Sequence, residues 1–319
     1  MATNVASRAT RNRFPTDRGL TARMTVTAFL IGALYAGVIT ALIFARLNIG
    51  VIVVIAAILL FCQYYFSDKM ALYAMHGRVV TPEQAPQLHA VVDRLCALAN
   101  MQKPAVAIAN TDVPNAFATG RNPNKAVLCV TTGILRRLNR DELEGVLSHE
   151  LSHVAHRDVA VMTIAGFLGV VAGFFTRILF YSSLFGGFGG RGGRGGGNNG
   201  GYAVLVFLAM MVFSMVVYTI SFLLTRTLSR YRELSADRSG AILTGQPSAL
   251  ASALVKVTGD MGKIPTNDLR HAEPFNAFFF APAKARGFSL STLFSTHPPL
   301  EVRLRQLTKI SQQLGQAAV

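Results

Sequence analysis

The sequence contains few charged residues and few cysteines. Only 15% of its 319 residues are charged, whereas 51% are hydrophobic, a balance that is typical of membrane proteins and not of ordinary soluble domains. The three cysteines, Cys62, Cys96 and Cys129, stand alone and form no C-x-x-C pair, which argues against a disulfide framework or a cysteine metal site. We therefore expect all three to be buried packing residues.

Acidic residues are scarce relative to basic ones, 16 against 31, and the formal net charge is +15. Such a surplus can indicate nucleic-acid binding, but the sequence has no zinc-finger or RNA-binding motif. The basic residues instead gather beside long apolar runs, as the positive-inside rule describes for membrane proteins. We therefore expect a lipid bilayer, and no nucleic acid, among the partners of the chain.

A phosphate-binding loop is also missing. Residues 186–201 are mostly glycine, but neither G-K-[ST] nor G-x-G-x-x-G stands there between a strand and a helix. Glycine-rich composition without helix or strand patterning is typical of a flexible segment. We expect an external loop between two membrane spans.

Four apolar runs are each about long enough, at ~20 residues, to cross a bilayer as a helix. They cover residues 24–45, 49–66, 159–179 and 202–224. Arginines gather before the first run and after the last, which predicts that both termini face the cytoplasm. The sequence thus divides into a basic tail (1–23), a transmembrane hairpin (24–66), a cytoplasmic region (67–158), a second transmembrane pair (159–225) and a C-terminal cytoplasmic region (226–319).

The stretch from Leu147 to Asp158 contains His149, Glu150 and His153 in the order H-E-x-x-H. Residues four apart share one face of a helix, so both imidazoles can reach one metal ion. Two imidazoles with an oxygen ligand and an open fourth position suit a catalytic zinc ion. Glu150 then stands beside the metal as the base that takes a proton from the attacking water. We expect one Zn²⁺ per chain.

A third metal ligand is expected from the helix that follows the last apolar run. The longer motif H-E-x-x-H-x-x-G-x-x-H is excluded, because this chain has His156 and Val159 where that motif requires glycine and histidine. Glu233 and Asp237 stand four residues apart beyond the fourth run. We expect Glu233 to bind the metal and Asp237 to accept the free ring N–H of a ligating histidine. The alternative is that both acids only balance nearby arginines.

Short β-rich runs predict a small sheet beside the metal helix. They cover residues 105–109 and 126–130, with 115–118 between them. An amphipathic helix is predicted before them, from Pro82 to Asn100, with Thr81 as its N-cap. The fold class is therefore a mainly α membrane protein, with four transmembrane helices and a zincin-like (gluzincin) α+β cytoplasmic domain.

Asn139 and Glu142 form a capping-box pattern that predicts the start of the metal helix, which should end near His156. Two further helices are expected at residues 248–258 and 299–314. Between them, Phe278, Phe279 and Phe280 are expected to be packing or interfacial anchors.

With these residues in place, the chain resembles the HtpX family of membrane zinc metallopeptidases, which are relatives of the CaaX prenyl proteases. The resemblance rests on H-E-x-x-H at residues 149–153, Glu233 and Asp237 after two apolar runs, Asn115-Ala116-Phe117-Ala118 before them and His297-Pro298 after. It implies a multi-pass endopeptidase of the bacterial inner membrane whose active site faces the cytoplasm. Its expected substrates are misfolded or damaged membrane proteins and unfolded polypeptides.

The resemblance also implies that His297 and Arg303 act near the active site. We expect His297 to donate a hydrogen bond to the oxyanion and Arg303 to orient or supplement it; surface positions on the last helix are the alternative. Asn115, Ala116 and Phe117 are expected to bind substrate by edge pairing, which accepts many sequences because backbone groups make the bonds. An ordinary edge strand is the other interpretation of these three residues.

Two other functions remain open at this point. A prenyl-protein (CaaX-type) protease would use the same chemistry, but such enzymes, as the family is known, enclose their site among more than four spans. A non-catalytic zinc-binding membrane adaptor is less well supported, because a structural site has no use for Glu150 beside the metal. Neither the cleavage specificity nor the oligomeric state follows from the sequence.

Overall fold

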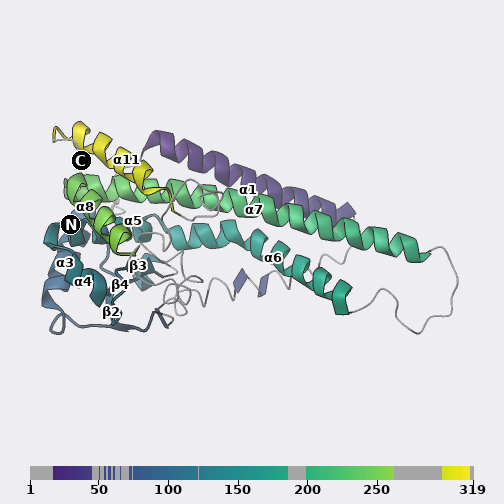
Figure 1. Ribbon diagram of the computed structural model, residues 1–319, viewed down its shortest axis with the longest axis horizontal. Helices are drawn as coiled ribbons and strands as arrows, with labels where there is room; N and C mark the ends of the chain where they lie inside the picture. Colours follow the sequence, from purple (N-terminus) through teal and green to yellow (C-terminus); the bar gives the residue numbers. More distant parts are fainter. Residues whose placement is uncertain are drawn as a thin grey trace, which may run out of the picture.

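Three long helices extend from a compact end in the computed structural model, which describes residues 17–44, 75–120, 122–185, 199–261 and 297–316, with isolated positions between 50 and 73. The long helices are α1 (Arg18–Phe44), α6 (Asp158–Phe185) and α7 (Asn199–Thr244). They lie beside one another along the long axis of the molecule (Figure 1). The remaining described helices and the sheet gather at one end of this bundle (Figure 1).

The long helices contain segments apolar enough to cross a membrane. Arg18–Thr40 and Phe207–Thr244 qualify by length and composition, and a third qualifies if α5 (Arg140–Ala155) and the start of α6, bent by 64°, count as one span. The predicted helices at residues 24–45, 159–179 and 202–224 are thus confirmed as helices. Most of the run at 49–66 and most of the glycine-rich segment 186–201 lie outside the described residues, so the count of four spans stays a prediction.

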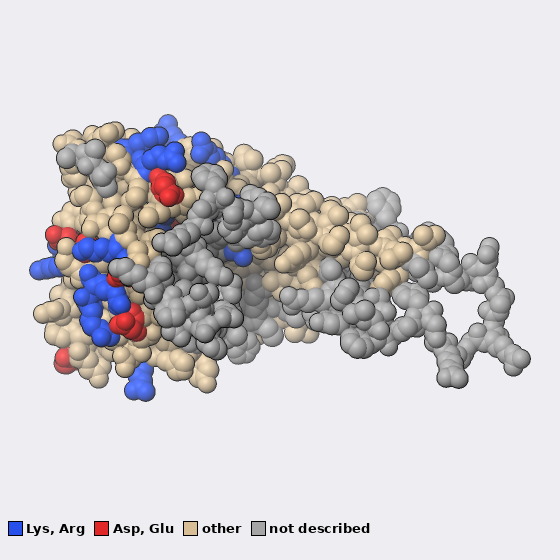
Figure 2. All heavy atoms as spheres, in the orientation of Figure 1, with Lys and Arg blue, Asp and Glu red and all other residues tan. Residues whose placement is uncertain are grey.

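Hydrogen bonds from side chains to the backbone connect the three long helices. The Tyr35 hydroxyl of α1 donates to the backbone oxygen of Ile164 and accepts from the backbone nitrogen of Leu168, both at 2.8 Å. On α7, the Thr225 hydroxyl donates to the backbone oxygen of Ala165 at 3.1 Å. Charged side chains gather at the compact end, whereas the visible described surface towards the far ends of the long helices is uncharged (Figure 2). That distribution is the one expected where apolar helices face lipid.

The compact end contains a four-stranded mixed sheet in the order β1-β2-β4-β3. Its strands are β1 (Gly77–Val79), β2 (Ala105–Ala109), β3 (Ala116–Thr119) and β4 (Val127–Thr131), with the 3-10 helix η1 (Pro123–Lys125) between the last two. Strands β2 and β4 are parallel, while β1 and β3 join the two edges in antiparallel pairing. Two or three strands were predicted, and all three β-rich runs form strands, with β3 and β4 each shifted by one residue; the short edge strand β1 was not predicted.

Helix α5, the predicted metal helix, occupies the centre of the compact end, where it contacts α7, α8 (Pro247–Met261) and β3. It begins with the predicted capping box, because the Asn139 side chain accepts from the Glu142 backbone nitrogen and the Glu142 carboxylate accepts from the Asn139 backbone nitrogen, both at 2.9 Å. Its apolar face is buried in the main core: Val146, Leu147 and Leu151 pack there with residues of the sheet and α8. The histidines of the motif are therefore carried by a firmly packed helix.

The other predicted helices differ from the structure mainly at their starts. Helix α3 spans Pro86–Ala99 and not Pro82–Asn100, and its N-cap is Ala85. The prediction of Thr81 as N-cap was therefore wrong, because residues 82–84 form a turn and the proline at position 86 occupies the first helical turn. The short helix α4 (Thr132–Arg137) follows β4 and precedes α5. Helices α8 and α11 (Leu300–Gln313) match the two C-terminal predictions.

Two of the three cysteines are buried free thiols, Cys96 and Cys129, as predicted. Cys62 lies outside the described residues, as does the loop with Phe278, Phe279 and Phe280.

Candidate metal centre

His149, His153 and Glu233 converge on one point between α5 and α7. The two Nε2 atoms are 3.2 Å apart. The Glu233 carboxylate reaches across from α7, with Oε2 at 3.7 Å from His149 Nε2 and Oε1 at 3.4 Å from His153 Nε2. One ligand atom from each of the three residues lies within 4.8 Å of the others. Two imidazole nitrogens and one carboxylate oxygen are a ligand set that suits a catalytic zinc ion with one open position.

The far side of each imidazole faces a carboxylate. His149 Nδ1 lies 2.9 Å from Asp237 Oδ1, and His153 Nδ1 lies 2.6 Å from Asp158 Oδ2. A carboxylate is an acceptor, so each Nδ1 is placed to donate to it, and in the neutral form that binds a metal each ring then presents the lone pair of Nε2. Two lone pairs and the charge of Glu233 therefore face each other at close range, an arrangement that repels itself unless a cation lies between them. The donor set fits a divalent metal for this reason.

Each of these carboxylates is paired with an arginine. Arg303 of α11 donates through Nε and Nη2 to the two carboxylate oxygens of Asp237, at 2.7 and 2.6 Å. Arg232 of α7 pairs with the other oxygen of Asp158. Arg303 is only 1% exposed and Asp237 is fully buried. The bidentate pair of Arg303 with Asp237 fixes the orientation of that carboxylate as well as its charge.

Glu150 lies beside His149 on α5, against the edge of the sheet. Its Oε2 accepts a hydrogen bond of 3.1 Å from the backbone nitrogen of Ala118 in β3. Burial raises the pKa of the Glu150 carboxyl above its usual range. A carboxyl with a raised pKa is better able to hold a proton during a reaction near neutral pH.

Strand β3 lies at the edge of the sheet directly beside α5. Ala116 pairs with Val130 and Phe117 with Cys129 on one side, and no described strand pairs with the other side of β3. The side chains of Asn115, Ala116 and Phe117 are buried. The side chains of these three residues are therefore turned away from any ligand at the edge, and a bound strand would meet backbone groups of β3, as in edge pairing.

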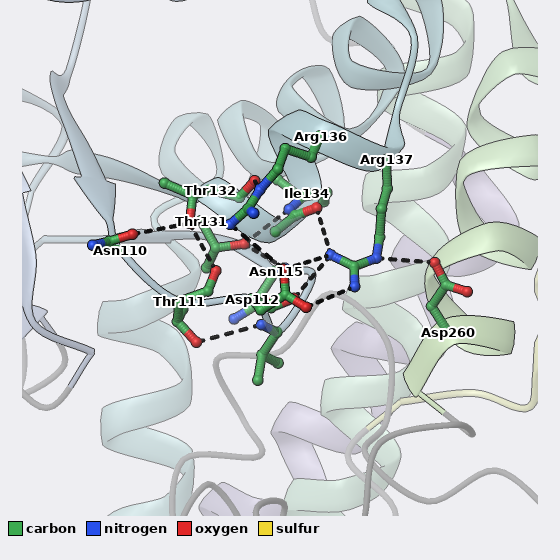
Figure 3. A network of polar contacts seen from close by, with 12 residues as sticks. Asn110, Thr111, Asp112, Asn115, Thr131, Thr132, Ile134, Arg136, Arg137 and Asp260 are labelled. Atoms are coloured by element: carbon green, nitrogen blue, oxygen red, sulfur yellow. Dashed lines mark hydrogen bonds and ion pairs between the residues drawn. The ribbon is translucent and has the colours of Figure 1, made fainter.

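The loop that leads into β3 is anchored by a polar network (Figure 3). Arg137 Nη1 donates to the backbone oxygen of Asp112 at 2.9 Å, Nη2 donates to its carboxylate at 3.0 Å, and Nε donates to Asp260 of α8 at 3.1 Å. At the end of the loop, the Asn115 backbone nitrogen donates to the Thr131 hydroxyl at 2.9 Å. These bonds hold the start of β3 in place relative to α4 and α8.

His297 and Arg303 lie at the site, but they contact its carboxylates. His297 is buried, and its Nδ1 lies 2.9 Å from Glu233 Oε2. The guanidinium of Arg303 binds Asp237, with Nη1 at 3.9 Å from Glu233. The resemblance implied that both residues act near the active site, and the structure brings both to the candidate metal centre. The contacts of Arg303 favour a role in holding Asp237 over the expected role beside the oxyanion.

Asp158 and Arg232 also lie at the site, and neither was predicted there. Their positions in the sequence are a possible signal, since Asp158 follows the second histidine by five residues and Arg232 immediately precedes Glu233. A small hollow of about 10 Å³ lies beside Asp158, lined by the end of β3 and by the α5–α6 corner, including His153. Its volume is about the room that one water molecule needs.

Glycine at position 240 lets α7 approach α5 at the site. A Cβ atom there would lie 2.9 Å from the backbone nitrogen of His149 and 3.2 Å from its Cα. Real Cβ atoms essentially never come closer than 3.0 Å to another heavy atom, so a larger residue forces the helices apart. This close approach brings the Glu233 helix within reach of the two histidines.

Comparison with known proteins agrees with this geometry. Residues 82–311 match the sequence profile of peptidase family M48. The chain is 57% identical over 307 residues to a protein named Protease HtpX homolog 1 from Streptomyces coelicolor, covering 96% of this chain and 98% of the relative. It is 52% identical over 304 residues to Protease HtpX homolog from Moorella thermoacetica, covering 95% and 98%.

Among solved structures, the fold is similar to the crystal structure of S. mikatae Ste24p, with a TM-score of 0.51. The two chains are 16% identical, and the match covers 91% of this chain and 66% of that one. At this level of identity the likeness supports the fold alone.

Proposed function

Because the chain belongs to peptidase family M48 and is a membrane-embedded metallopeptidase of the HtpX type, we propose that it is a zinc endopeptidase whose ion is held by His149, His153 and Glu233. The observation that carries the ligand assignment is the convergence of two Nε2 lone pairs and one carboxylate. The fold would then be zincin-like with an acidic third ligand, as in gluzincins. Asp237 would fix the tautomer of His149.

Zn²⁺ bound there would polarise the scissile carbonyl and acidify the attacking water. The Glu150 carboxylate takes a proton from that water and passes it to the leaving amine. Its hydrogen bond from the Ala118 backbone nitrogen points the carboxylate towards β3. The substrate would lie along the edge of β3 that no described strand pairs, near residues 115–117, where bonds to backbone groups accept many sequences.

His297 and Arg303 would support the reaction in different ways. His297 contacts the proposed ligand Glu233 through Nδ1, and we propose that its ring helps to stabilise the oxyanion. Arg303 holds Asp237 and so acts through His149. Arg303 is therefore a positioning residue in this proposal.

The substrates we propose are misfolded or damaged membrane proteins, because the site is carried by α5 and α7, the second of which continues into an apolar span. Arg226, Arg230 and Arg238 follow the apolar part of α7, so the positive-inside rule favours a site on the cytoplasmic side of a bacterial inner membrane. A cysteine placed between residues 186 and 201 should react with a membrane-impermeant thiol reagent from outside. Reaction from the cytoplasmic side alone would overturn this orientation.

The central test compares variants of the purified protein in detergent. Glu150→Gln should keep zinc and lose cleavage of an unfolded membrane protein, because it removes the base and no ligand. Glu233→Ala should lose zinc as well as cleavage. Glu144→Gln is the matched control, since Glu144 is a buried acid of the same helix that pairs with Arg94. Zinc content that is unchanged in Glu233→Ala would remove Glu233 from the ligand set, and full cleavage by Glu150→Gln would refute the mechanism.

A further inference from the structure

We propose that Asp158 is a positioning residue for the metal centre: it holds His153 in the tautomer and orientation that bind the metal, and it ties that ligand to the start of α6. This inference rests on the proposed zinc site and extends it to a residue outside the H-E-x-x-H motif and outside the Glu233 helix. It makes the first residue of an apolar helix part of the machinery that sets metal affinity.

The contact between the two side chains is direct and buried. Asp158 Oδ2 lies 2.6 Å from His153 Nδ1, and the Asp158 residue is 7% exposed. The carboxylate accepts the Nδ1 proton, so the lone pair that remains on His153 is the one on Nε2. Among the described residues, Asp158 is the one acid within ion-pair distance of this nitrogen. Removing the carboxylate leaves the tautomer and the ring rotation of His153 without this support.

The chain bends sharply to make this contact. Residues five apart on a continuous helix point about 140° away from each other, so an unbroken α5 would carry position 158 away from the His153 face. The helices α5 and α6 instead meet at 64°, and Arg157 adopts a left-handed backbone with φ of 56°. Non-glycine residues rarely adopt that conformation, and such strain is typical of functional sites. Here its result is that the Asp158 carboxylate lies against the His153 ring.

A second partner makes the contact a three-helix junction. Arg232 pairs with the other oxygen of Asp158, and it immediately precedes the proposed ligand Glu233 on α7. The junction therefore joins α5, α6 and α7 at the two ligands His153 and Glu233. His149 has a corresponding support in Asp237, but that support comes from α7 and does not involve α6.

The test measures zinc affinity on the full-length protein in detergent, by competition with a chelator of known affinity. Loss of a carboxylate that supports a ligating histidine typically weakens metal binding by 10- to 100-fold, and we expect that loss in Asp158→Ala. Asp158→Asn should fall between wild type and Asp158→Ala, because its amide oxygen can still accept from Nδ1 but carries no charge. The absorption spectrum of Co²⁺ in the site should shift in both variants, since the geometry of one ligand changes.

Glu144→Gln separates positioning from general stability. It disturbs another buried acid paired with an arginine, and it should keep wild-type zinc affinity while the thermal midpoint of the metal-free protein falls. A merely structural Asp158 would behave in the same way, with a lower midpoint and unchanged zinc affinity, and that result would overturn the inference. If Asp158→Ala does not fold, the near-isosteric Asp158→Asn decides by the same measurement.

His153→Ala distinguishes failure of this inference from failure of the proposed function. If His153→Ala loses zinc while both Asp158 variants bind it normally, the zinc site stands and the inference falls. If His153→Ala itself binds zinc normally, the proposed ligand set falls, and the inference falls with it. In the His153→Ala background, Asp158→Ala should change the residual zinc affinity less than twofold, because Asp158 acts through that ring. A further loss of tenfold or more would show an action by another route and would overturn the inference.

Discussion

Gly240→Ala is expected to weaken metal binding through a displacement of helices, without touching any ligand. The new Cβ would lie 2.9 Å from the backbone nitrogen of His149, whereas ordinary van der Waals contact begins at 3.4 Å. Helices α5 and α7 must therefore separate locally by the difference, about 0.5 Å. The two atoms nearest to the new Cβ, the nitrogen and the Cα of His149, belong to the helix backbone, so no flexible side chain can absorb the shift.

The magnitude of this shift decides which property changes most. Metal–ligand distances in well-formed sites stay within about 0.2 Å of their preferred values, so moving Glu233 by ~0.5 Å relative to His149 is a large change for the site. We expect zinc binding to weaken at least tenfold, or ~1.4 kcal/mol. The free energy of unfolding should show a smaller net change, because two effects oppose each other. Overpacking costs ~1–3 kcal/mol, whereas alanine gains ~1 kcal/mol over glycine in a helix.

Gly259→Ala in α8 is the matched control, because its new Cβ would meet no atom within 4 Å. It should raise stability by ~0.5–1 kcal/mol through helix propensity alone and leave zinc affinity unchanged. Both variants are measured by chelator competition for zinc and by thermal unfolding of the metal-free protein. Wild-type zinc affinity in Gly240→Ala would refute the argument that the close helix contact sets the ligand geometry.

Three further predictions concern other parts of the site and the core. His297→Ala should lower kcat by about 10²- to 10³-fold, the usual cost of losing one oxyanion donor, while zinc content stays close to wild type; near-normal turnover would leave His297 with a structural role. Arg137→Ala should raise KM for a long peptide more than it changes kcat or zinc content, because it frees Asp112 and the loop before β3; an unchanged KM would dissociate that loop from substrate binding. Cys96 and Cys129 should resist thiol reagents at pH 8 in the folded protein and react only after unfolding, because burial raises their pKa values to about 11 and about 12; rapid labelling of the native protein would contradict this burial.

The features that the sequence predicted well are those that depend on local spacing. The capping box at Asn139 and Glu142 marks the start of α5 because both partners lie within one helical turn. The histidines at positions 149 and 153 share a face for the same reason. Glu233 and Asp237 also share a face, so one helix presents the proposed ligand and the partner of His149 together.

The features that the sequence could not predict depend on the path of the chain between elements. Asp158 reaches His153 only because the helix breaks at residues 156 and 157. The spacing of apolar residues predicts helices and strands, but it does not predict such a bend. Arg303 meets Asp237 across 66 positions of the sequence, so its partner is fixed by the packing of α11 on α7. The short strand β1 has too few residues for a period-two pattern to be recognised.

Helix α7 is 46 residues long, about 69 Å, and runs without interruption from its apolar half to Thr244. With its apolar half in a bilayer, α7 would transmit a change of tilt from the lipid to Glu233 at its other half. About 30 Å separate Phe213, within the apolar half, from Glu233 along the axis, so a change in tilt of only ~2° would move the carboxylate by ~1 Å. Bilayer thickness changes the tilt of apolar helices. The thickness of the surrounding lipid would thus act on the proposed metal centre, and turnover in reconstituted vesicles should depend on acyl-chain length.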